Sequence, residues 1–535
     1  MKRSLMGAAV ILACGVMAGS AQTNSAITGT WVGGFEAGGE FGFYSATVDA
    51  GDPPSGIGSV PMRDLSGPLR ITLDGPRVRI EGPASVVLSG IIDRDTMTGD
   101  FEAQGGRTKG AFRLIRIATV EPAALVRYQG AYQFDDGRIL MVERAPMSPA
   151  LGVTDASSGV ARVVFAVAPA TFIAGPSVLV PYPTEYTLSF ETSGNRVTGV
   201  VRTSQAGRPE RATRVPTVEE EVSFRNGDVT LRGTLVLPAA RGPHPALVFT
   251  HGGGAALREW FWGFGHLMAA RGFAVLAYDK RGVGASSGGW RDAGFEDLAD
   301  DAVAAAKFLQ GRPDINGTRI GFWGLSQGAW IAPLAGVRFK DTAFVMTLSG
   351  GGLTPAEGEL LDSEWELRKA GFSEAEIADA LAFQTAKNTF MRVGAGWEDY
   401  AARRTRATQP RAPWYGLPWT DLSGPPNADN PEWGRTRRFY FYDPAPTLRA
   451  LRAPLLGLFG ELDTPKGVEL NGKAMSAALS EGGNRDFTVR VFPNGRHNLM
   501  DMSGASPNEF ARLQRFVPGL FEVMASWLLE RAARQ

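Results

Sequence analysis

The chain has 535 residues, which is too long for one compact core and predicts three or four structural units. Its 55 basic and 55 acidic residues cancel, so we expect no general electrostatic binding of nucleic acid. The four histidines lack metal-ligand spacing, and the single cysteine, Cys14, excludes a disulfide framework, an iron–sulfur site and a cysteine zinc site. The sequence therefore predicts no metal site and no other cofactor.

The first residues have the pattern of a secretory signal. Two basic residues precede an uncharged apolar run, Leu5–Ala18, and small residues follow up to Ala21. This run is too short to span a bilayer permanently, and no later stretch reaches 18 uninterrupted apolar residues, so we expect no membrane span. The pattern predicts a signal peptide over residues 1–21, cleaved after Ala21, and a periplasmic or secreted protein. A buried first helix and a lipoprotein anchored through Cys14 are the alternatives.

From residue 22 to residue 216, short alternating runs of apolar and polar residues are separated by glycine turns. Period-two alternation with frequent turns predicts antiparallel β-structure. Two halves open similarly, on Gly29-Thr30-Trp31 and on Gly130-Ala131-Tyr132, which indicates a weak internal repeat. We expect two β-rich domains, residues 22–120 and 121–216, each a small barrel or a sandwich. No motif in them points to a specific function.

From residue 217 to residue 535, fully apolar strands alternate with amphipathic helices. This order predicts a mostly parallel sheet flanked by helices on both faces. An insertion at about residues 353–438 interrupts the alternation, and it is long enough to form a helical cap over the carboxyl edge of the sheet, where ligands bind in such folds. Representative predicted strands are Ala246–Thr250, Phe273–Tyr278 and Pro454–Phe459, and representative helices are Leu257–Arg271, Phe295–Leu309 and Asn508–Arg534.

The pattern G-x-S-x-G occurs twice, at Gly284–Gly288 and at Gly324–Gly328. The first copy lies in a glycine-rich loop with no helix directly after it. The second copy joins a predicted strand, Arg319–Trp323, directly to a predicted helix, Gln327–Val337. This motif requires a tight strand-to-helix turn that presents the serine hydroxyl at the rim of a sheet. We therefore predict Ser326 as a nucleophile, against the alternative of a helix N-cap serine.

A serine hydroxyl needs a positioned base to act as a nucleophile at neutral pH. His497 lies in the loop after a predicted strand and is the candidate base. The other three histidines have structural interpretations: His244 in a surface loop between prolines, His266 inside a helix, and His251 at the end of a strand, where it shapes the next loop.

The carboxylate that orients this base is expected at the end of the preceding strand, which favours Asp463, with Glu461 as the alternative. The order nucleophile, acid, base along the chain is that of α/β-hydrolases. Acyl transfer also requires donors for the developing oxyanion. We predict the backbone N–H of Gln327, at the start of a helix, and that of Gly253, in a run of three glycines.

The carboxyl-terminal part resembles the α/β-hydrolase superfamily, and more narrowly the bacterial secreted serine esterases related to the prolyl-oligopeptidase-like and serine-aminopeptidase-like branches. The resemblance covers about residues 219–535 and implies that Asp279 and Arg281 belong to a structural loop. Two positions depart from the family pattern: Ala329 stands where a further glycine is usual, and Arg496 precedes the predicted base. The matching stretches are Phe249–Gly254, Tyr278–Ser286, Gly324–Gly328, Asp443–Pro446, Gly460–Asp463 and Phe492–His497.

These features predict a serine hydrolase that cleaves a small or medium carboxylic ester through an acyl-enzyme. A serine exopeptidase or acyl-peptide hydrolase would use the same triad and would need acids for a substrate amine, such as Glu357, Glu359 and Glu364, which otherwise form a solvated helix face. A non-catalytic glycan- or wall-binding protein is the third alternative. Aromatics of the insertion, including Trp414 and Trp419, either line an acyl pocket or form the core of the cap itself. The expected partner is a small ester or a short peptide.

Overall fold

The structure is a computed structural model that describes residues 26–533, apart from residues 38–39, 61–64, 104–105, 107, 145–149, 179–180, 182, 206, 418–419, 421 and 504–512. The predicted signal peptide, Cys14 and Trp419 lie outside the described residues. The chain forms two compact units. One comprises Met1–Val215 with Ser503–Arg515, and the other comprises Pro216–Met502 with Phe516–Gln535.

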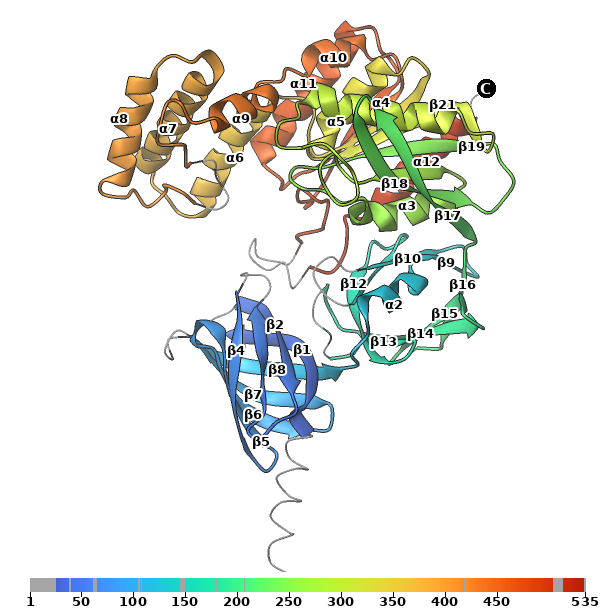
Figure 1. The fold of residues 1–535 in the computed structure, drawn as a ribbon, viewed down its shortest axis with the longest axis vertical. Helices are drawn as coiled ribbons and strands as arrows, with labels where there is room; N and C mark the ends of the chain where they lie inside the picture. Colours follow the sequence, from blue (N-terminus) through green and yellow to red (C-terminus); the bar gives the residue numbers. More distant parts are fainter. Residues whose placement is uncertain are drawn as a thin grey trace, which may run out of the picture. The chain divides into compact units, whose positions relative to one another are not determined.

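The first unit begins with a closed antiparallel barrel in which each strand pairs with the next and the last pairs with the first (Figure 1). Alternate side chains point inward and fill the barrel with a core that includes Trp31, Tyr44 and Phe101. The barrel consists of β1 (Gly29–Ala37), β2 (Glu40–Asp49), β3 (Ser55–Val60), β4 (Leu65–Asp74), β5 (Arg77–Glu81), β6 (Val87–Asp93), β7 (Thr96–Ala103) and β8 (Thr108–Ile117).

A second closed antiparallel barrel follows in the same unit, after the short helix α2 (Pro122–Leu125). Its interior holds a separate core that includes Tyr128, Phe172 and Phe190. The sequence left open whether each β-rich half is a barrel or a sandwich, and both halves are barrels. The second consists of β9 (Gly130–Phe134), β10 (Ile139–Arg144), β11 (Leu151–Asp155), β12 (Ala161–Ala168), β13 (Thr171–Ala174), β14 (Tyr186–Ser193), β15 (Arg196–Ser204) and β16 (Glu210–Arg214).

The first strand of the first barrel is fastened by an aromatic ring and an arginine. Trp31 Nε1 donates to the carbonyl oxygen of Ile27 at 2.7 Å. The guanidinium of Arg116, from β8, lies 4.6 Å from the centre of the Trp31 ring and donates to the carbonyl oxygen of Thr28. Gly29 has a φ of +125°, which turns the chain into β1 between these contacts.

The second barrel repeats this arrangement at its own first strand. Tyr132 Oη donates to the carbonyl oxygen of Tyr128 at 2.7 Å, and the guanidinium of Arg214, from β16, lies 6.0 Å from the Tyr132 ring. Arg214 also donates to the carbonyl oxygen of Gln129 at 2.6 Å. Gly130, with a φ of +143°, takes the position of the first barrel's glycine. The similar openings in the sequence therefore correspond to the same fastening of the first strand to the last.

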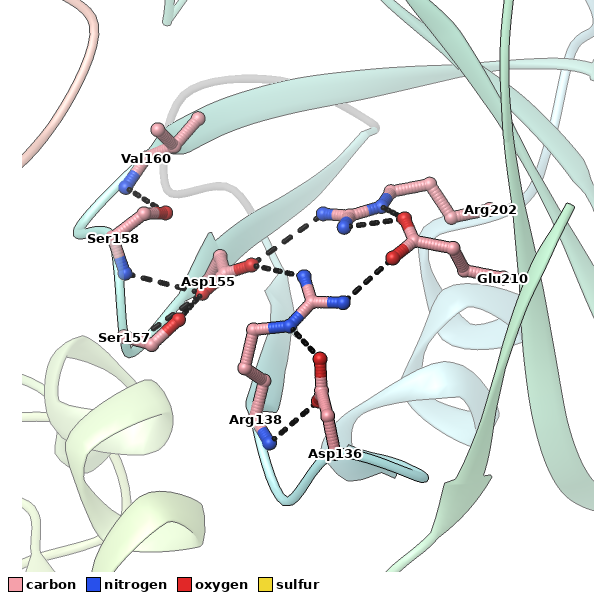
Figure 2. Close-up of polar contacts among 8 residues, drawn as sticks. All are labelled: Asp136, Arg138, Asp155, Ser157, Ser158, Val160, Arg202 and Glu210. Carbon is pink, nitrogen blue, oxygen red and sulfur yellow. Dashed lines mark hydrogen bonds and ion pairs between the residues drawn. The ribbon is translucent and has the colours of Figure 1, made fainter. Parts of the chain in front are cut away.

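One end of the second barrel is tied by a network of charged side chains (Figure 2). Arg138 donates to Asp136 and Glu210, both at 2.6 Å, and Arg202 donates to Glu210 at 2.7 Å. Asp155 accepts from both arginines and is nearly buried. Because each charge in the network has an opposite partner, it joins β11, β15 and β16 to the turn between β9 and β10 as a structural brace.

The second unit contains a twisted sheet in the order β17-β18-β20-β19-β21-β22-β23-β24. The first two strands and the β18–β20 pair are antiparallel, and every pair from β20 to β24 is parallel. The expected mostly parallel sheet is confirmed. Its strands are β17 (Thr217–Asn226), β18 (Val229–Pro238), β19 (His244–Thr250), β20 (Ala274–Tyr278), β21 (Ile315–Leu325), β22 (Thr342–Leu348), β23 (Leu455–Gly460) and β24 (Phe487–Phe492).

Helices cover both faces of this sheet, as its fully apolar central strands require (Figure 1). On one face, α4 (Phe295–Gln310), α5 (Gly328–Arg338), α10 (Ala445–Ala450) and α11 (Pro465–Glu481) share one apolar core with the strands. On the other face lie α3 (Trp262–Ala270) and α12 (Leu520–Ala533). The last helix begins at Leu520 rather than at the expected Asn508, because Pro518-Gly519 forms the turn that precedes it.

The insertion between β22 and β23 is helical and has a core of its own. It contains α6 (Pro355–Lys369), α7 (Glu374–Val393), α8 (Trp397–Thr408) and α9 (Glu432–Tyr440). Capping boxes at Thr354 and Ser373 begin the first two helices. Phe383, Phe390 and Tyr400 are buried in this core. Among the helices that the structure describes, none has the length and apolar character of a membrane span.

Candidate active site

Ser326 lies in the tight turn between β21 and α5. Its φ of +56° is a left-handed conformation that side chains rarely adopt, and its side chain is half-buried. Both flanking glycines are required: a Cβ on Gly324 would collide with the carbonyl oxygen of Gly328, and one on Gly328 would lie 2.6 Å from the carbonyl oxygen of Thr250. The second G-x-S-x-G segment thus has the strained strand-to-helix geometry that the sequence predicts for it.

Asp463 and His497 meet beyond the ends of β23 and β24. Nδ1 of His497 donates to Oδ2 of Asp463 at 2.8 Å. Glu461, the alternative acid, accepts instead from the backbone N–H of Asn494 at 3.0 Å and so stabilises the turn before the histidine. Of the two carboxylates that the sequence proposed, the structure brings Asp463 to the imidazole.

The end of β22 links the serine turn to the histidine loop. The backbone N–H of Ser326 donates to the carbonyl oxygen of Leu348 at 2.9 Å. The next residue, Ser349, donates its hydroxyl to the carbonyl oxygen of His497 at 2.7 Å. Ser326 and His497 are therefore bonded to two consecutive residues, Leu348 and Ser349, at the carboxyl edge of the sheet, where neighbouring parallel strands bring their following loops together.

The imidazole of His497 is electrostatically tuned. Its side chain is 52% exposed, and desolvation works to lower its pKa. The hydrogen bond and charge of Asp463 outweigh this effect, so the pKa of His497 is raised above its usual value. Because Nδ1 donates to the carboxylate, the neutral ring has its lone pair at Nε2, the nitrogen that could accept a proton.

Asp362, a second carboxyl group beside this pair, was not predicted from the sequence. It lies on α6 of the insertion, and its Oδ1 is in short hydrogen-bond contact with the hydroxyl of Thr464, the residue after Asp463. Burial raises the pKa of Asp362 to about 6, and its charge also raises the pKa of His497. An acidic residue on a helix of mixed polarity carries no sequence signal of this position, because the contact depends on how the insertion packs.

The glycine loop after β19 lies next to the serine turn. A Cβ on Gly252 would lie 3.8 Å from Cβ of Ser326. A Cβ on Gly253 would have no atom within 4 Å, so this part of the loop is open. Gln327 follows the serine and precedes the first residue of α5. The two predicted oxyanion donors, Gly253 and Gln327, therefore belong to the two segments that adjoin Ser326.

The other three histidines have structural partners. Nε2 of His251 lies 2.5 Å from the carbonyl oxygen of Tyr278, and burial lowers the pKa of His251 to about 3, so the ring is neutral. Nε2 of His266, in α3, lies 3.1 Å from Glu219. His244 corrects an expectation: it is the buried first residue of β19 rather than part of a surface loop, and its ring contacts the carbonyl oxygen of Ala240.

Asp279 and Arg281, which the resemblance places in a structural loop, form hydrogen bonds within the protein. Oδ2 of Asp279 accepts from the backbone N–H of Ala285 at 3.0 Å. The guanidinium of Arg281 forms two hydrogen bonds with Asp301, at 2.6 and 2.7 Å, and so fastens the loop to α4.

Three acids of the insertion have partners within the protein. Glu357 forms the capping box of α6, Glu359 contacts the hydroxyl of Tyr440, and Glu364 accepts from Arg368. Among the described residues, no group of three or more His, Cys, Asp or Glu side chains is arranged to hold a metal ion.

Trp414 lies in the insertion's own core, where its ring centre is 5.6 Å from that of Phe383. With 2% of its surface exposed, Trp414 presents almost no area to a ligand. This placement does not fit the expectation that it lines a substrate pocket, and it favours the alternative of a core residue. Trp419, the other expected pocket residue, lies outside the described residues.

Comparisons with known proteins match the carboxyl-terminal half. The model of a family described as "Alpha/beta hydrolase family" matches residues 247–513. The mitochondrial acyl-coenzyme A thioesterase 2 of Rattus norvegicus is 28% identical over 320 residues, 58% of this chain and 62% of that protein. Esterase EstD of Thermotoga maritima is 28% identical over 142 residues, 25% of this chain and 34% of that protein.

The matched stretches therefore span less than two thirds of either relative. The solved structure of proline iminopeptidase from Mycobacterium smegmatis has a TM-score of 0.36 at 19% identity, over 58% of this chain and 99% of that chain.

Proposed function

The chain belongs to the α/β-hydrolase superfamily, and from that premise we propose that it is a serine hydrolase that cleaves carboxylic esters through Ser326, His497 and Asp463. The observation that carries the proposal is the 2.8 Å hydrogen bond between Asp463 and His497, in loops tied to the strained turn of Ser326. A histidine that only faced solvent would not need an orienting carboxylate.

In the proposed first step, Ser326 Oγ attacks the carbonyl carbon while Nε2 of His497 takes its proton. The resulting imidazolium is stabilised by Asp463. Nε2 then returns the proton to the leaving alcohol as the acyl-enzyme forms. In the second half, a water molecule attacks the acyl carbon, His497 takes a proton from that water, and the same proton returns to Ser326 as the acid leaves.

Both tetrahedral intermediates carry an oxyanion, which the backbone N–H groups of Gly253 and Gln327 would hold. Gln327 is suited to this role because it stands at the positive end of α5. Removing one such donor typically costs about 10²–10³ in kcat, so these two peptide groups account for a large part of the expected rate enhancement.

The insertion is proposed to act as a cap that limits substrate size. The support is the contact of Asp362, on α6, with Thr464 beside Asp463, which brings at least this helix to the edge of the sheet that carries the triad. The buried aromatics of α7 and α8 stabilise the insertion itself. Selectivity would then come from residues of α6 and the loops around it rather than from Trp414.

The relatives favour acyl transfer from oxygen or sulfur: one is named a thioesterase and another an esterase. A peptidase remains the second candidate because the same triad serves amides. The structural partners of Glu357, Glu359 and Glu364 count against it, since an exopeptidase needs free acids to bind a substrate amine.

The proposal is tested with p-nitrophenyl acetate and butyrate, a thioester of the same acyl group, and aminoacyl-nitroanilides, with Ser326→Ala as the blank. We expect ester turnover, together with labelling of Ser326 by a fluorophosphonate located by peptide mass spectrometry. Turnover of the nitroanilides alone would favour the peptidase. Absence of turnover and of labelling in the folded wild-type protein would refute a serine hydrolase.

We also propose that the protein is exported to the periplasm or secreted, on the pattern of residues 1–21. The amino-terminal sequence of the protein expressed with its leader is the measurement. A mature chain that begins at Gln22 supports cleavage after Ala21, whereas incorporation of labelled palmitate at Cys14 would show the lipoprotein alternative to be correct.

A further inference from the structure

Lys280 is a buried cation behind the glycine loop that adjoins Ser326. It lies just after β20, and 1% of its surface is exposed. Its Nζ donates to the carbonyl oxygens of Gly252 at 3.0 Å and Gly254 at 3.1 Å, and to Oε1 of Gln327 at 2.6 Å. An ammonium group has three N–H bonds. All three are therefore engaged, and all three acceptors belong to the two segments that carry the predicted oxyanion donors.

Lys280 makes these bonds without a counterion. Among the described residues it forms no ion pair, and the other contact of its ammonium group is the face of Trp290, 5.6 Å from the ring centre. Burying an unpaired charge is costly, and here it lowers the pKa of the amine to about 8. Buried groups with strongly shifted pKa values are concentrated at functional sites.

The bonds of Lys280 determine which way the peptide groups of the loop face. In a planar trans peptide the C=O and the following N–H point in opposite directions. Since the carbonyl of Gly252 points to Lys280, the N–H of Gly253 points away from it. This N–H is the donor that the sequence predicts for the oxyanion, and Gly252 itself lies against Ser326.

Little else holds this part of the loop. A Cβ on Gly253 or Gly254 would have no atom within 4 Å, and Gly254 has a φ of +75°. Glycines in such open surroundings can rotate their peptide groups at little cost. The ammonium group supplies the constraint that packing does not, and through Gln327 it ties the same loop to the start of α5.

We propose that Lys280 is a positioning residue of this active site, which fixes the peptide groups of the Gly252–Gly254 loop and the side chain of Gln327 and adds positive potential behind the oxyanion. The inference rests on the proposed function. Lys280 does not act as a base, because all three of its N–H groups donate hydrogen bonds to the protein. Its effect on the reaction is through the residues that it holds. The developing negative charge would lie in front of the loop, with the ammonium group behind it.

Two titratable side chains, His251 and Asp279, lie next to Lys280. His251, at the end of β19, is neutral because burial lowers its pKa to about 3. Asp279, the preceding residue, directs its carboxylate to the backbone N–H groups of Arg258 and Ala285. Gln327 and Trp290 do not titrate. Loss of the Lys280 proton would remove one donor and the positive charge together.

The test compares Lys280→Met with Lys340→Met, the same substitution at an exposed lysine. For p-nitrophenyl butyrate we expect Lys280→Met to lower kcat by about 10²-fold with a KM within a few-fold of wild type, since donors that act in the transition state are misplaced. Lys340→Met should match wild type. The rate of Ser326 labelling by a fluorophosphonate should fall with kcat, because that reaction also forms an oxyanion.

A pH profile separates positioning from a merely structural role. In wild type kcat should fall as the pH rises through the pKa of Lys280, about 8, whereas Lys280→Met should lack this alkaline decline. A Lys280→Met variant with wild-type kcat, or one with low kcat that keeps the alkaline decline, would overturn the inference.

If Lys280→Met does not fold, as judged by circular dichroism, Lys280→Gln serves in its place, because it retains N–H donors without the charge. It should also lose the alkaline decline, and keeping the decline would overturn the inference. Failure of the proposed function is a different result: wild type would then neither hydrolyse the ester nor be labelled at Ser326.

Discussion

The two G-x-S-x-G segments of this chain have the same five-residue pattern and different structures. Ser286, in Gly284–Gly288, is buried, donates its hydroxyl to the carbonyl oxygen of Asp279 at 2.7 Å and accepts from the backbone N–H of Arg232 at 3.0 Å. Ser326 is half-buried in a left-handed turn, and within the described part of the chain its hydroxyl has no hydrogen bond. One hydroxyl holds a loop together, and the other is left available for chemistry.

The glycines of the two segments are also needed for different reasons. A Cβ on Gly284 would lie 2.6 Å from Oδ2 of Asp279, so this glycine lets the loop wrap around a carboxylate that braces it. Gly324 and Gly328 instead allow a strand and a helix to meet at a very short turn. The pattern therefore marks close packing against glycine in both places, but only the second copy lies at a strand-to-helix junction.

The largest expected effect is a loss of activity when Ser326 or His497 is replaced. Ser326→Ala or His497→Ala, each made alone, should lower kcat/KM for p-nitrophenyl acetate by roughly 10⁴-fold or more, because members of a triad act as a unit. Burst and steady-state kinetics on folded protein are the measurement. If Ser286→Ala abolished turnover in a folded protein while Ser326→Ala did not, the assignment of the two segments would be reversed.

The next largest effect is expected from Asp463, the acid that contacts His497. Asp463→Asn keeps the shape of the side chain and removes the charge at the 2.8 Å hydrogen bond, so the tautomer of His497 is no longer fixed and its protonated form loses its partner. We expect kcat to fall by about 10⁴-fold, as for the equivalent change in a known triad. Glu461→Gln is the matched control and should change kcat little; the opposite ranking would make Glu461 the orienting acid.

The sequence is informative where local chemistry determines structure. The β-rich half was predictable from period-two alternation, and the parallel sheet from apolar strands that alternate with helices. Ser326 and its two partners could be proposed because each stands at a strand end, where sequence patterns are sharp. The same reasoning misplaced His244 and the start of the last helix, because burial of one strand residue and a Pro-Gly turn depend on neighbours that periodicity does not describe.

What the sequence could not supply were contacts between distant segments. Asp362, on a helix of the insertion, contacts Thr464 beside the Asp463–His497 pair, and Lys280, just after the end of β20, contacts the glycine loop. Trp414 illustrates the same limit for apolar residues, since a tryptophan in a pocket and one in a core have the same local sequence. Only the packing around Phe383 and Phe390 distinguishes them.

A smaller effect, on stability rather than activity, is expected on the Ser286 side. Ser286→Ala removes a buried hydroxyl and leaves the N–H of Arg232 without its acceptor, which should lower the free energy of unfolding by about 1–3 kcal/mol. Activity should stay within a few-fold of wild type. Ser287→Ala is the control, because Ser287 accepts a similar bond from Thr230 but is exposed, and it should cost less. Urea denaturation with parallel assays gives both values, and equal costs for the two serines would contradict a special role for Ser286.

The smallest effect we expect is a shift in the pH dependence of kcat/KM when Asp362 is replaced. It would test whether Asp362 acts electrostatically on His497. The charge of Asp362 raises the pKa of His497, and the acid limb of kcat/KM reports that pKa because only the neutral imidazole acts as a base. Asp362→Asn removes the charge and keeps a group that hydrogen-bonds to Thr464. The acid limb should therefore move to lower pH, whereas Asp379→Asn, at an exposed acid of α7, should leave it in place.

The pH dependence of the free energy of unfolding gives a second, independent measurement on Asp362→Asn. The pKa of Asp362 is raised to about 6 in the folded protein, so its stabilising effect is complete below the unfolded pKa and is lost as the pH rises through about 6. The neutral Asn has no charge to desolvate, so Asp362→Asn should be at least as stable as wild type at neutral pH and should lose this pH dependence. If instead the acid limb moved upward, or stayed fixed while the stability profile changed, the carboxyl group of α6 would be a packing residue of the insertion with no electrostatic effect on His497.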